Sequence, residues 1–129
     1  MVVVDASAIL EILLKRARAV DLRARLSGEK VNAPHLIDVE VMHVLRRYAL
    51  SGDLDEARAR KAIADHMQTP IERHGHESLL GVVWQLRDNF TAYDGMYVAL
   101  GVALRATLIT TDLRLARAAE SILPVEVFA

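Results

Sequence analysis

Two carboxylates follow apolar, β-branched runs in this sequence. Asp5 comes directly after Val2–Val4, and Asp112 follows Leu108–Thr111. Runs of this kind are typical of buried strands. In an open parallel sheet, ligands bind beyond the carboxyl ends of the strands. We therefore expect these two acids to lie at one rim of a sheet.

Two further acids occupy helix positions that should be buried. Glu40 has Leu36, Ile37 and Val44 as its neighbours one helical turn away. Asp94 lies on a similarly apolar face of a later helix. A buried carboxylate without a partner is unstable as an anion and tends to be protonated. Both positions therefore require a compensating group.

These four acids point to a cation site. Clustered carboxylates repel one another unless a cation lies among them, and hard oxygen ligands suit Mg²⁺ or Mn²⁺. The sequence has no cysteine, which excludes disulfides, zinc thiolates and thiol nucleophiles. Carboxylates that hold a divalent ion are the chemistry of metal-assisted phosphodiester hydrolysis.

Each acid also has an ordinary structural interpretation. Asp5 and Asp112 could cap the helices that follow them. Asp94 is the third residue after Thr91, which is the spacing of a capping box. Glu40 could pair with a basic neighbour on its own helix, namely His43, Arg46 or Arg47.

The elements that must position the acids follow from the hydrophobic pattern. We expect strands at 2–4, 31–33, 71–74, 107–110 and 125–128. We expect helices from about 8 to 14, up to 26, and at 34–49, 54–67, 77–87, 92–105 and 113–119, with Ser7 and Asp53 as N-caps. Alternating strands and helices predict a three-layer α/β/α sandwich with a short, mainly parallel central sheet.

Length and charge set the remaining bounds. The 129 residues suit one domain spanning 1–129, and 53% hydrophobic residues predict a real core. The net charge of −1 gives no global signal for nucleic acid. The longest uncharged run, Gly95–Leu104, is well short of the roughly 18 residues that span a bilayer. Asp5 interrupts the only early apolar run, so we expect no secretory signal, no membrane contact and a cytoplasmic protein.

Four segments, in order, resemble the motifs of PIN-domain ribonucleases, specifically the VapC toxins of bacterial toxin–antitoxin pairs. The segments are Val3–Ile9; Ala33-Pro34 with Asp38–Val41 and Leu45–Arg47; Tyr93-Asp94 with Tyr97–Leu100; and Leu108–Asp112 with Leu115-Ala116. The resemblance covers nearly the whole chain and implies a PIN-like fold.

The resemblance also implies roles. Asp5, Glu40, Asp94 and Asp112 would be catalytic and would hold one or two Mg²⁺ or Mn²⁺ ions, with Ser7 and Thr110 as supporting hydroxyls. The protein would be a metal-dependent endoribonuclease that cuts structured RNA, either tRNA or rRNA. It would form a homodimer and be held inactive by a cognate VapB-type antitoxin.

Two positions depart from the family pattern. Gly95 stands where alanine is usual, and Arg114 and Leu115 stand where some relatives carry a further acid. The second departure leaves four acidic ligands. The alternative function is a non-catalytic PIN-like module that binds RNA or protein, and metal binding separates the two hypotheses.

Overall fold

The computed structural model describes all 129 residues, and strands alternate with helices along the chain. The strands are β1 (Val2–Val4), β2 (Val31–Pro34), β3 (Glu72–His74), β4 (Thr107–Thr110) and β5 (Val125–Val127). The helices are α1 (Ala6–Leu13), α2 (Ala19–Leu26), α3 (Leu36–Ser51), α4 (Glu56–Gln68), α5 (Leu80–Gln85), α6 (Ala92–Leu104) and α7 (Leu113–Ala119), and a 3₁₀ turn, η1 (Glu77–Leu79), precedes α5.

The five strands form one parallel sheet in the order β3-β2-β1-β4-β5. Val3 of the central strand β1 pairs with Asn32 on one side and with Leu108 on the other. Because β1 and β4 are parallel neighbours, the residues that follow them emerge at the same rim. This confirms the expected sheet and places Asp5 and Asp112 at the same end of it.

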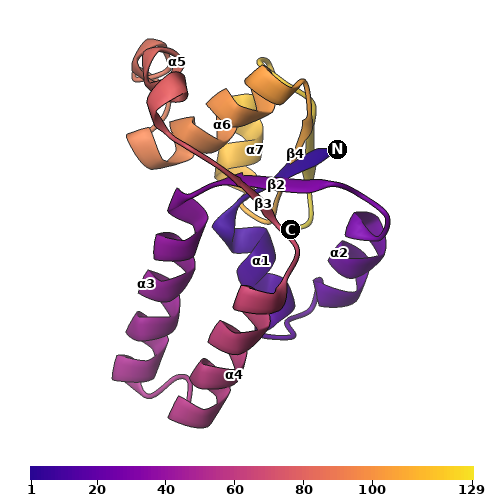
Figure 1. The fold of residues 1–129 in the computed structure, drawn as a ribbon, viewed down its shortest axis with the longest axis vertical. Coiled ribbons are helices and arrows are strands. Elements are labelled where there is room, and N and C mark those ends of the chain that lie inside the picture. Colours follow the sequence, from indigo (N-terminus) through magenta and orange to yellow (C-terminus); the bar gives the residue numbers. More distant parts are fainter.

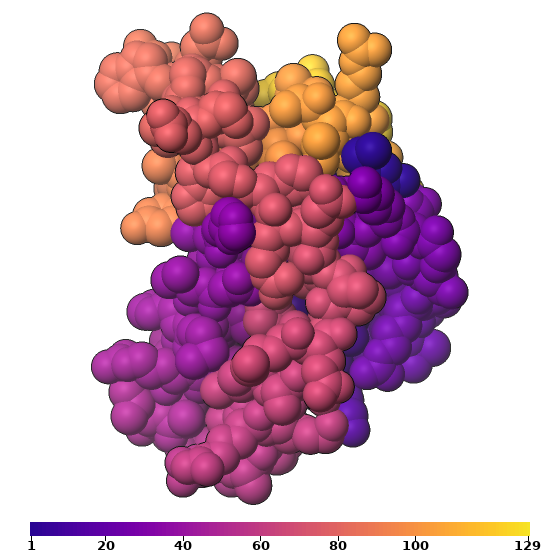
Figure 2. Space-filling model, in the orientation of Figure 1, coloured from indigo at the N-terminus to yellow at the C-terminus, as the bar shows by residue number.

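Helices cover both faces of the sheet, as predicted. Helices α1–α4 lie on one side and α5–α7 on the other (Figure 1). The chain from α4 through β3 to α5 crosses the face drawn in Figure 2, so β3 is an exposed edge strand. The valines of β1 are fully buried, and α6 has an unbroken run of buried residues from Gly95 to Gly101. None of the helices is both long and apolar enough to cross a membrane.

Two helices begin at different caps from those expected. Asp5, not Ser7, caps α1, because its Oδ1 accepts the backbone N–H of Ala8 at 3.0 Å. Ser7 is already inside the helix. Asp55, not Asp53, caps α4 in the same way, whereas Asp53 accepts a bond from the hydroxyl of a neighbouring serine. Aspartate accepts from the first-turn amides when its backbone is extended and it directly precedes the helix. Asp5 precedes α1 and Asp55 precedes α4 with that backbone.

The helix that carries Glu40 also begins later than expected. Pro34 still pairs with His74 in the sheet, so α3 starts at Leu36 rather than at the proline. It ends at Ser51 because Gly52 adopts the left-handed conformation, with φ of 85°, and its N–H donates to the carbonyl of Ala49. These bounds put Glu40 in the second turn of α3, near the sheet.

A polar cluster joins α3 to α4 and to the edge strand β3. Asp38 accepts from Arg73 Nε at 2.8 Å, and its other oxygen lies 2.7 Å from His66 Nε2. His66 is buried, and its Nδ1 has no hydrogen-bond partner. Partial burial would raise the pKa of Asp38, but the bonds from Arg73 and His66 hold that pKa below its usual value. Asp38 is therefore a structural acid, although it lies only two residues from Glu40.

We predict that Asp38→Ala lowers the free energy of unfolding by about 1–3 kcal/mol, because it leaves His66 and Arg73 without their shared partner. Urea unfolding at neutral pH measures this. The matched control is Asp21→Ala, which removes an exposed ion pair with Arg18 at 3.7 Å and should cost less than about 1 kcal/mol. Equal losses in the two variants would contradict a structural role for the cluster.

Candidate active site

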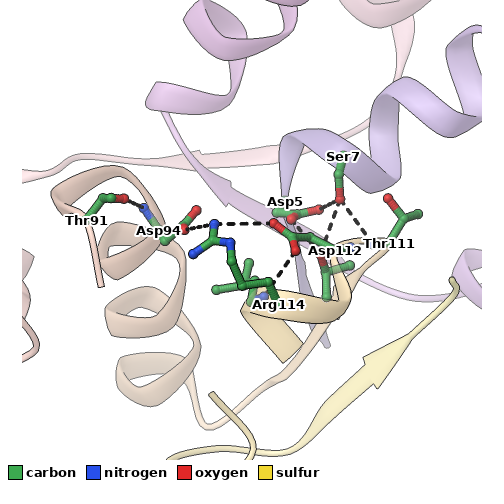
Figure 3. Close-up of polar contacts among 9 residues, drawn as sticks. Asp5, Ser7, Thr91, Asp94, Thr111, Asp112 and Arg114 are labelled. Atoms are coloured by element: carbon green, nitrogen blue, oxygen red, sulfur yellow. Dashed lines mark hydrogen bonds and ion pairs between the residues drawn. The ribbon is translucent and has the colours of Figure 1, made fainter. Parts of the chain in front are cut away.

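Asp5 is a buried carboxylate at the end of the central strand. Its side chain accepts the hydroxyl of Ser7 at 2.7 Å and the hydroxyl of Thr110 at 2.6 Å, in addition to the amide of Ala8 (Figure 3). Burial raises the pKa of Asp5 to about 6, although these three bonds oppose the rise, and the charge of Asp112 adds to it. The effect of burial on the pKa exceeds that of the hydrogen bonds. The carboxylate is therefore held in place, but its negative charge is not fully compensated.

The two predicted hydroxyls connect the ends of β1 and β4. Ser7 Oγ also accepts the backbone N–H of Thr111 at 3.1 Å, and Thr110 Oγ1 accepts the backbone N–H of Asp112 at 3.0 Å. The two hydroxyl oxygens lie 3.2 Å apart. The network orients Asp5 and sets the direction in which the chain leaves β4 toward Asp112.

Glu40 reaches the same rim from α3. Its Oε1 accepts the hydroxyl of Tyr97 at 2.5 Å, so its partner is not one of the basic residues on its own helix. Burial raises the pKa of Glu40, the bond from Tyr97 lowers it, and the charge of Asp94 raises it again. Sequence reasoning placed Tyr97 only in the motif that follows Asp94, and the bond from its hydroxyl to Glu40 is the feature that it missed.

Asp94 and Asp112 stand at the starts of α6 and α7. Thr91 caps α6 and accepts the backbone N–H of Asp94 at 3.1 Å, which matches the capping-box spacing. Asp112 caps α7 through Oδ1, which accepts the N–H of Leu115 at 3.1 Å. Arg114 contacts both acids, with its Nη2 at 3.0 Å from Asp94 Oδ2 and 3.6 Å from Asp112 Oδ2 (Figure 3). The helix-capping interpretation therefore holds for Asp5 and Asp112. Each has a second oxygen outside the cap: Asp5 Oδ2 accepts the hydroxyl of Thr110, and Asp112 Oδ2 faces Arg114.

The four acids act on one another electrostatically. The charges of Glu40, Asp5 and Asp94 all add to burial in raising the pKa of Tyr97, whose hydroxyl donates to Glu40. Arg114 then joins Asp94 to Asp112. The structure thus brings together the four acids that the sequence singled out, each from a different element.

The residues fit a divalent ion in chemical type. All of the acidic donors are carboxylate oxygens, which suit Mg²⁺ or Mn²⁺. The rim already attracts a cation, because the guanidinium of Arg114 contacts two of the carboxylates. As the side chains stand, no three His, Asp or Glu groups are close enough to hold one ion. Binding an ion there requires rotation of at least some of these side chains.

We predict a specific pH dependence for the metal-free protein. A raised folded-state pKa means that the stability contributed by Asp5 is present below its unfolded pKa, near 3.8, and is lost as pH rises through about 6. Asp5→Asn should therefore gain stability relative to wild type between about pH 4 and pH 7, by on the order of 3 kcal/mol. Urea unfolding in chelator across this range measures the gain.

The control for this prediction is Asp21→Asn, which alters an exposed acid. Its stability difference from wild type should stay flat over the same pH range. A flat difference for Asp5→Asn as well would show that the Asp5 carboxylate is not destabilised by its burial.

Comparison with known proteins identifies the family. The PIN domain model matches residues 2–121. Ribonuclease VapC1 of Mycobacterium tuberculosis is 46% identical over 118 residues, which are 90% of this chain and 89% of that protein. Ribonuclease VapC9 of the same organism is 38% identical over 127 residues, or 98% of each chain.

Solved structures share the fold at lower identity. A Pyrobaculum aerophilum protein superposes with a TM-score of 0.74 at 21% identity, over 97% of this chain and 82% of that one. A toxin–antitoxin complex from Klebsiella pneumoniae gives a TM-score of 0.68 at 17% identity, over 98% and 97% of the two chains. With its parallel sheet, its rim of four acids and these relatives, the chain belongs to the PIN-domain family, among the VapC ribonucleases.

Proposed function

We propose that this protein is an endoribonuclease that requires Mg²⁺ or Mn²⁺ and hydrolyses phosphodiester bonds of structured RNA. The observation that carries the proposal is the meeting of Asp5, Glu40, Asp94 and Asp112 at one rim of the sheet. Two of these acids, Asp5 and Glu40, have raised pKa values caused first by burial. An added divalent cation would stabilise their charged forms.

The chain's own residues would hold and orient that cation. Asp5 is fixed by three hydrogen-bond donors, and Glu40 is fixed by the hydroxyl of Tyr97. Asp94 and Asp112 would complete the ligand set from the opposite side. A bound Mg²⁺ or Mn²⁺ would lower the pKa of a water molecule and neutralise charge on the phosphate oxygens. Hydrogen bonds that orient metal ligands commonly affect affinity or activity by about 10- to 100-fold.

A hollow beside the acids offers room for part of the substrate. Its volume is about 430 Å³, and it lies between α1 and α3. Ser7, Glu40 and Tyr93 line it together with apolar side chains. Apolar and aromatic walls suit a nucleobase unstacked from its neighbours, and proteins read single-stranded or looped RNA in this way. Loops of tRNA and of rRNA are the two substrate classes we propose.

We predict that purified protein cleaves bacterial tRNA or rRNA in Mg²⁺ or Mn²⁺, and that excess chelator abolishes the cleavage. Asp5→Asn should reduce the rate by at least about 100-fold, since it removes the best-held carboxylate at the rim. Gel analysis and sequencing of the RNA ends measure the rate and locate the cut. Asp21→Asn, which alters an exposed acid in the first turn of α2, is the matched control and should cut like wild type.

Cleavage that persists in chelator, or equally in Asp5→Asn, would contradict a metal-dependent mechanism at this rim. Tight RNA binding without cleavage in either metal would instead favour the non-catalytic module. The two outcomes are separated by running binding and cleavage assays on the same RNA.

We propose that an antitoxin is the natural inhibitor and that the protein acts in the cytoplasm, where its RNA substrates lie. The support comes from the relatives, which are VapC ribonucleases, and from a structural neighbour that is a toxin–antitoxin complex. A partner of the VapB type would then bind this chain and suppress its cleavage of RNA.

A homodimer is the proposed oligomeric state. Large apolar side chains are exposed on two helices, with Val39 and Met42 on α3 and Leu80 and Trp84 on α5. Figure 1 shows α3 and α5 on opposite faces of the sheet but both toward the left-hand edge of the molecule as drawn. Trp84 is 67% exposed and carries the guanidinium of Arg87 over its ring. Exposed aromatic side chains of this size are enriched in protein interfaces.

We predict that Trp84→Glu converts a dimer of the wild-type protein into a monomer at micromolar concentration. A buried charge without a partner opposes association, whereas a solvent-exposed one does not. Sedimentation velocity measures the change. Met67→Glu on α4, where Met67 is 76% exposed, is the control and should leave the dimer intact. A wild-type monomer, or a dimer in both variants, would contradict the assignment of this surface.

A further inference from the structure

Arg114 is the positively charged group at the acidic rim, and it contacts two of the four carboxylates through one nitrogen. Its Nη2 lies 3.0 Å from Asp94 Oδ2 and 3.6 Å from Asp112 Oδ2. Figure 3 shows the guanidinium reaching from the start of α7 across to Asp94 on α6. Neither acid makes another side-chain ion pair.

This contact uses the oxygens that a metal ion would need. Asp112 Oδ1 accepts the N–H of Leu115 at the start of α7, so Oδ2 is the oxygen of Asp112 that remains for a cation. Asp94 likewise gives Oδ2 to Arg114. No three acidic groups lie close enough to hold an ion in this arrangement. The guanidinium therefore stands where two of the ligands would converge.

The side chain of Arg114 can move away from the two carboxylates that it contacts. Its side chain is 71% exposed, and its two carboxylates are its only ion-pair partners. Ion pairs with this exposure are screened by water and are weak. An arginine does not lose its charge near neutral pH, so a second cation can share these carboxylates only if the guanidinium moves. A divalent ion competes with it directly.

The displaced guanidinium would remain at the site. Arg114 is the second residue of α7, so its backbone stays beside Asp112 whichever way the side chain turns. Guanidinium groups bind phosphate through paired N–H donors. An RNA strand whose phosphate lies at the metal would bring a suitable anion within reach of the released side chain.

We propose that Arg114 is a built-in cation that holds Asp94 and Asp112 in the metal-free protein, is displaced by the divalent ion, and then binds an RNA phosphate. This inference rests on the proposed metal-dependent function and assigns a positioning role to a residue outside the acidic ligand set. Metal and substrate would thus be coupled, because the ion releases the group that helps to bind the RNA.

The first test measures metal binding without RNA. Mn²⁺ is titrated calorimetrically into the wild-type protein, Arg114→Gln and Arg117→Gln. Arg117 lies one turn further along α7, so its variant makes the same change in net charge. Arg114→Gln should bind Mn²⁺ about three- to tenfold more tightly than wild type, since two competing ion pairs are gone. Arg117→Gln should stay within about twofold.

Three results would overturn the inference in different ways. Wild-type binding with no gain in Arg114→Gln, or with a loss, would show that Arg114 does not compete with the ion, and would leave the proposed function standing. No Mn²⁺ binding by wild type or by either variant would overturn the proposed function and this inference together. A gain of equal size in Arg117→Gln would reduce the effect to net charge and would also overturn the inference.

The second test examines the RNA step at saturating Mn²⁺. Arg114→Gln should raise KM for RNA about three- to tenfold and leave kcat within about threefold, because a phosphate contact to the substrate is lost. Arg114→Lys should recover part of the loss, since it keeps the charge without the paired donors. An unchanged KM in Arg114→Gln would overturn the phosphate-binding part of the proposal.

Discussion

The carboxylate of Asp5 is buried at the end of the central strand, and the organisation of the site depends on how it is held. Three donors converge on it from α1 and β4, namely the amide of Ala8 and the hydroxyls of Ser7 and Thr110. These bonds fix its position but do not offset its burial, because its pKa still rises to about 6. A site that orients an anion and leaves it short of positive charge is prepared for a cation.

Helix capping and metal binding are compatible uses of the same residues here. Asp5 and Asp112 each cap the helix that follows a strand, and each uses one oxygen for the backbone amide. The cap holds the side chain and leaves the other oxygen for a second contact, with Thr110 in the case of Asp5 and with Arg114 in the case of Asp112. Since parallel neighbours β1 and β4 end together, the two caps lie at the same end of the sheet. Glu40 and Asp94 then approach from helices on opposite sides of the sheet.

The sequence predicted the strands, most helices and that Asp5 and Asp112 lie at one end of the sheet, because each depends on local pattern. Val2–Val4 is followed directly by Asp5, and Asp112 comes two residues after Thr107–Thr110; the parallel pairing of the two runs follows from the helices between them. At the starts of α1 and α4 the sequence favoured Ser7 and Asp53 as caps. The caps are Asp5, which the sequence offered as an alternative, and Asp55, because several short polar residues stand near each helix start and only backbone geometry selects one.

What the sequence could not predict are contacts between elements distant along the chain. The bond from Tyr97 to Glu40 and the ion pairs of Arg114 depend on how α3, α6 and α7 pack around the sheet. Local signals for both existed, because Tyr97 is one turn after Asp94 and Arg114 is two residues after Asp112. Their partners, however, required the tertiary structure. The three-element cluster around Asp38 was hidden for the same reason.

The central claim is that the four carboxylates at this rim form one divalent-cation site. A crystal structure of the protein grown with Mn²⁺, with anomalous scattering recorded to locate the ion, tests it most directly. The account predicts a manganese peak in contact with Asp5 and at least one of the other three acids, with the guanidinium of Arg114 moved away from Asp112. Crystals grown with Mn²⁺ that show no manganese peak at the rim would contradict it. A manganese peak elsewhere, with Arg114 still bridging Asp94 and Asp112, would contradict it as well.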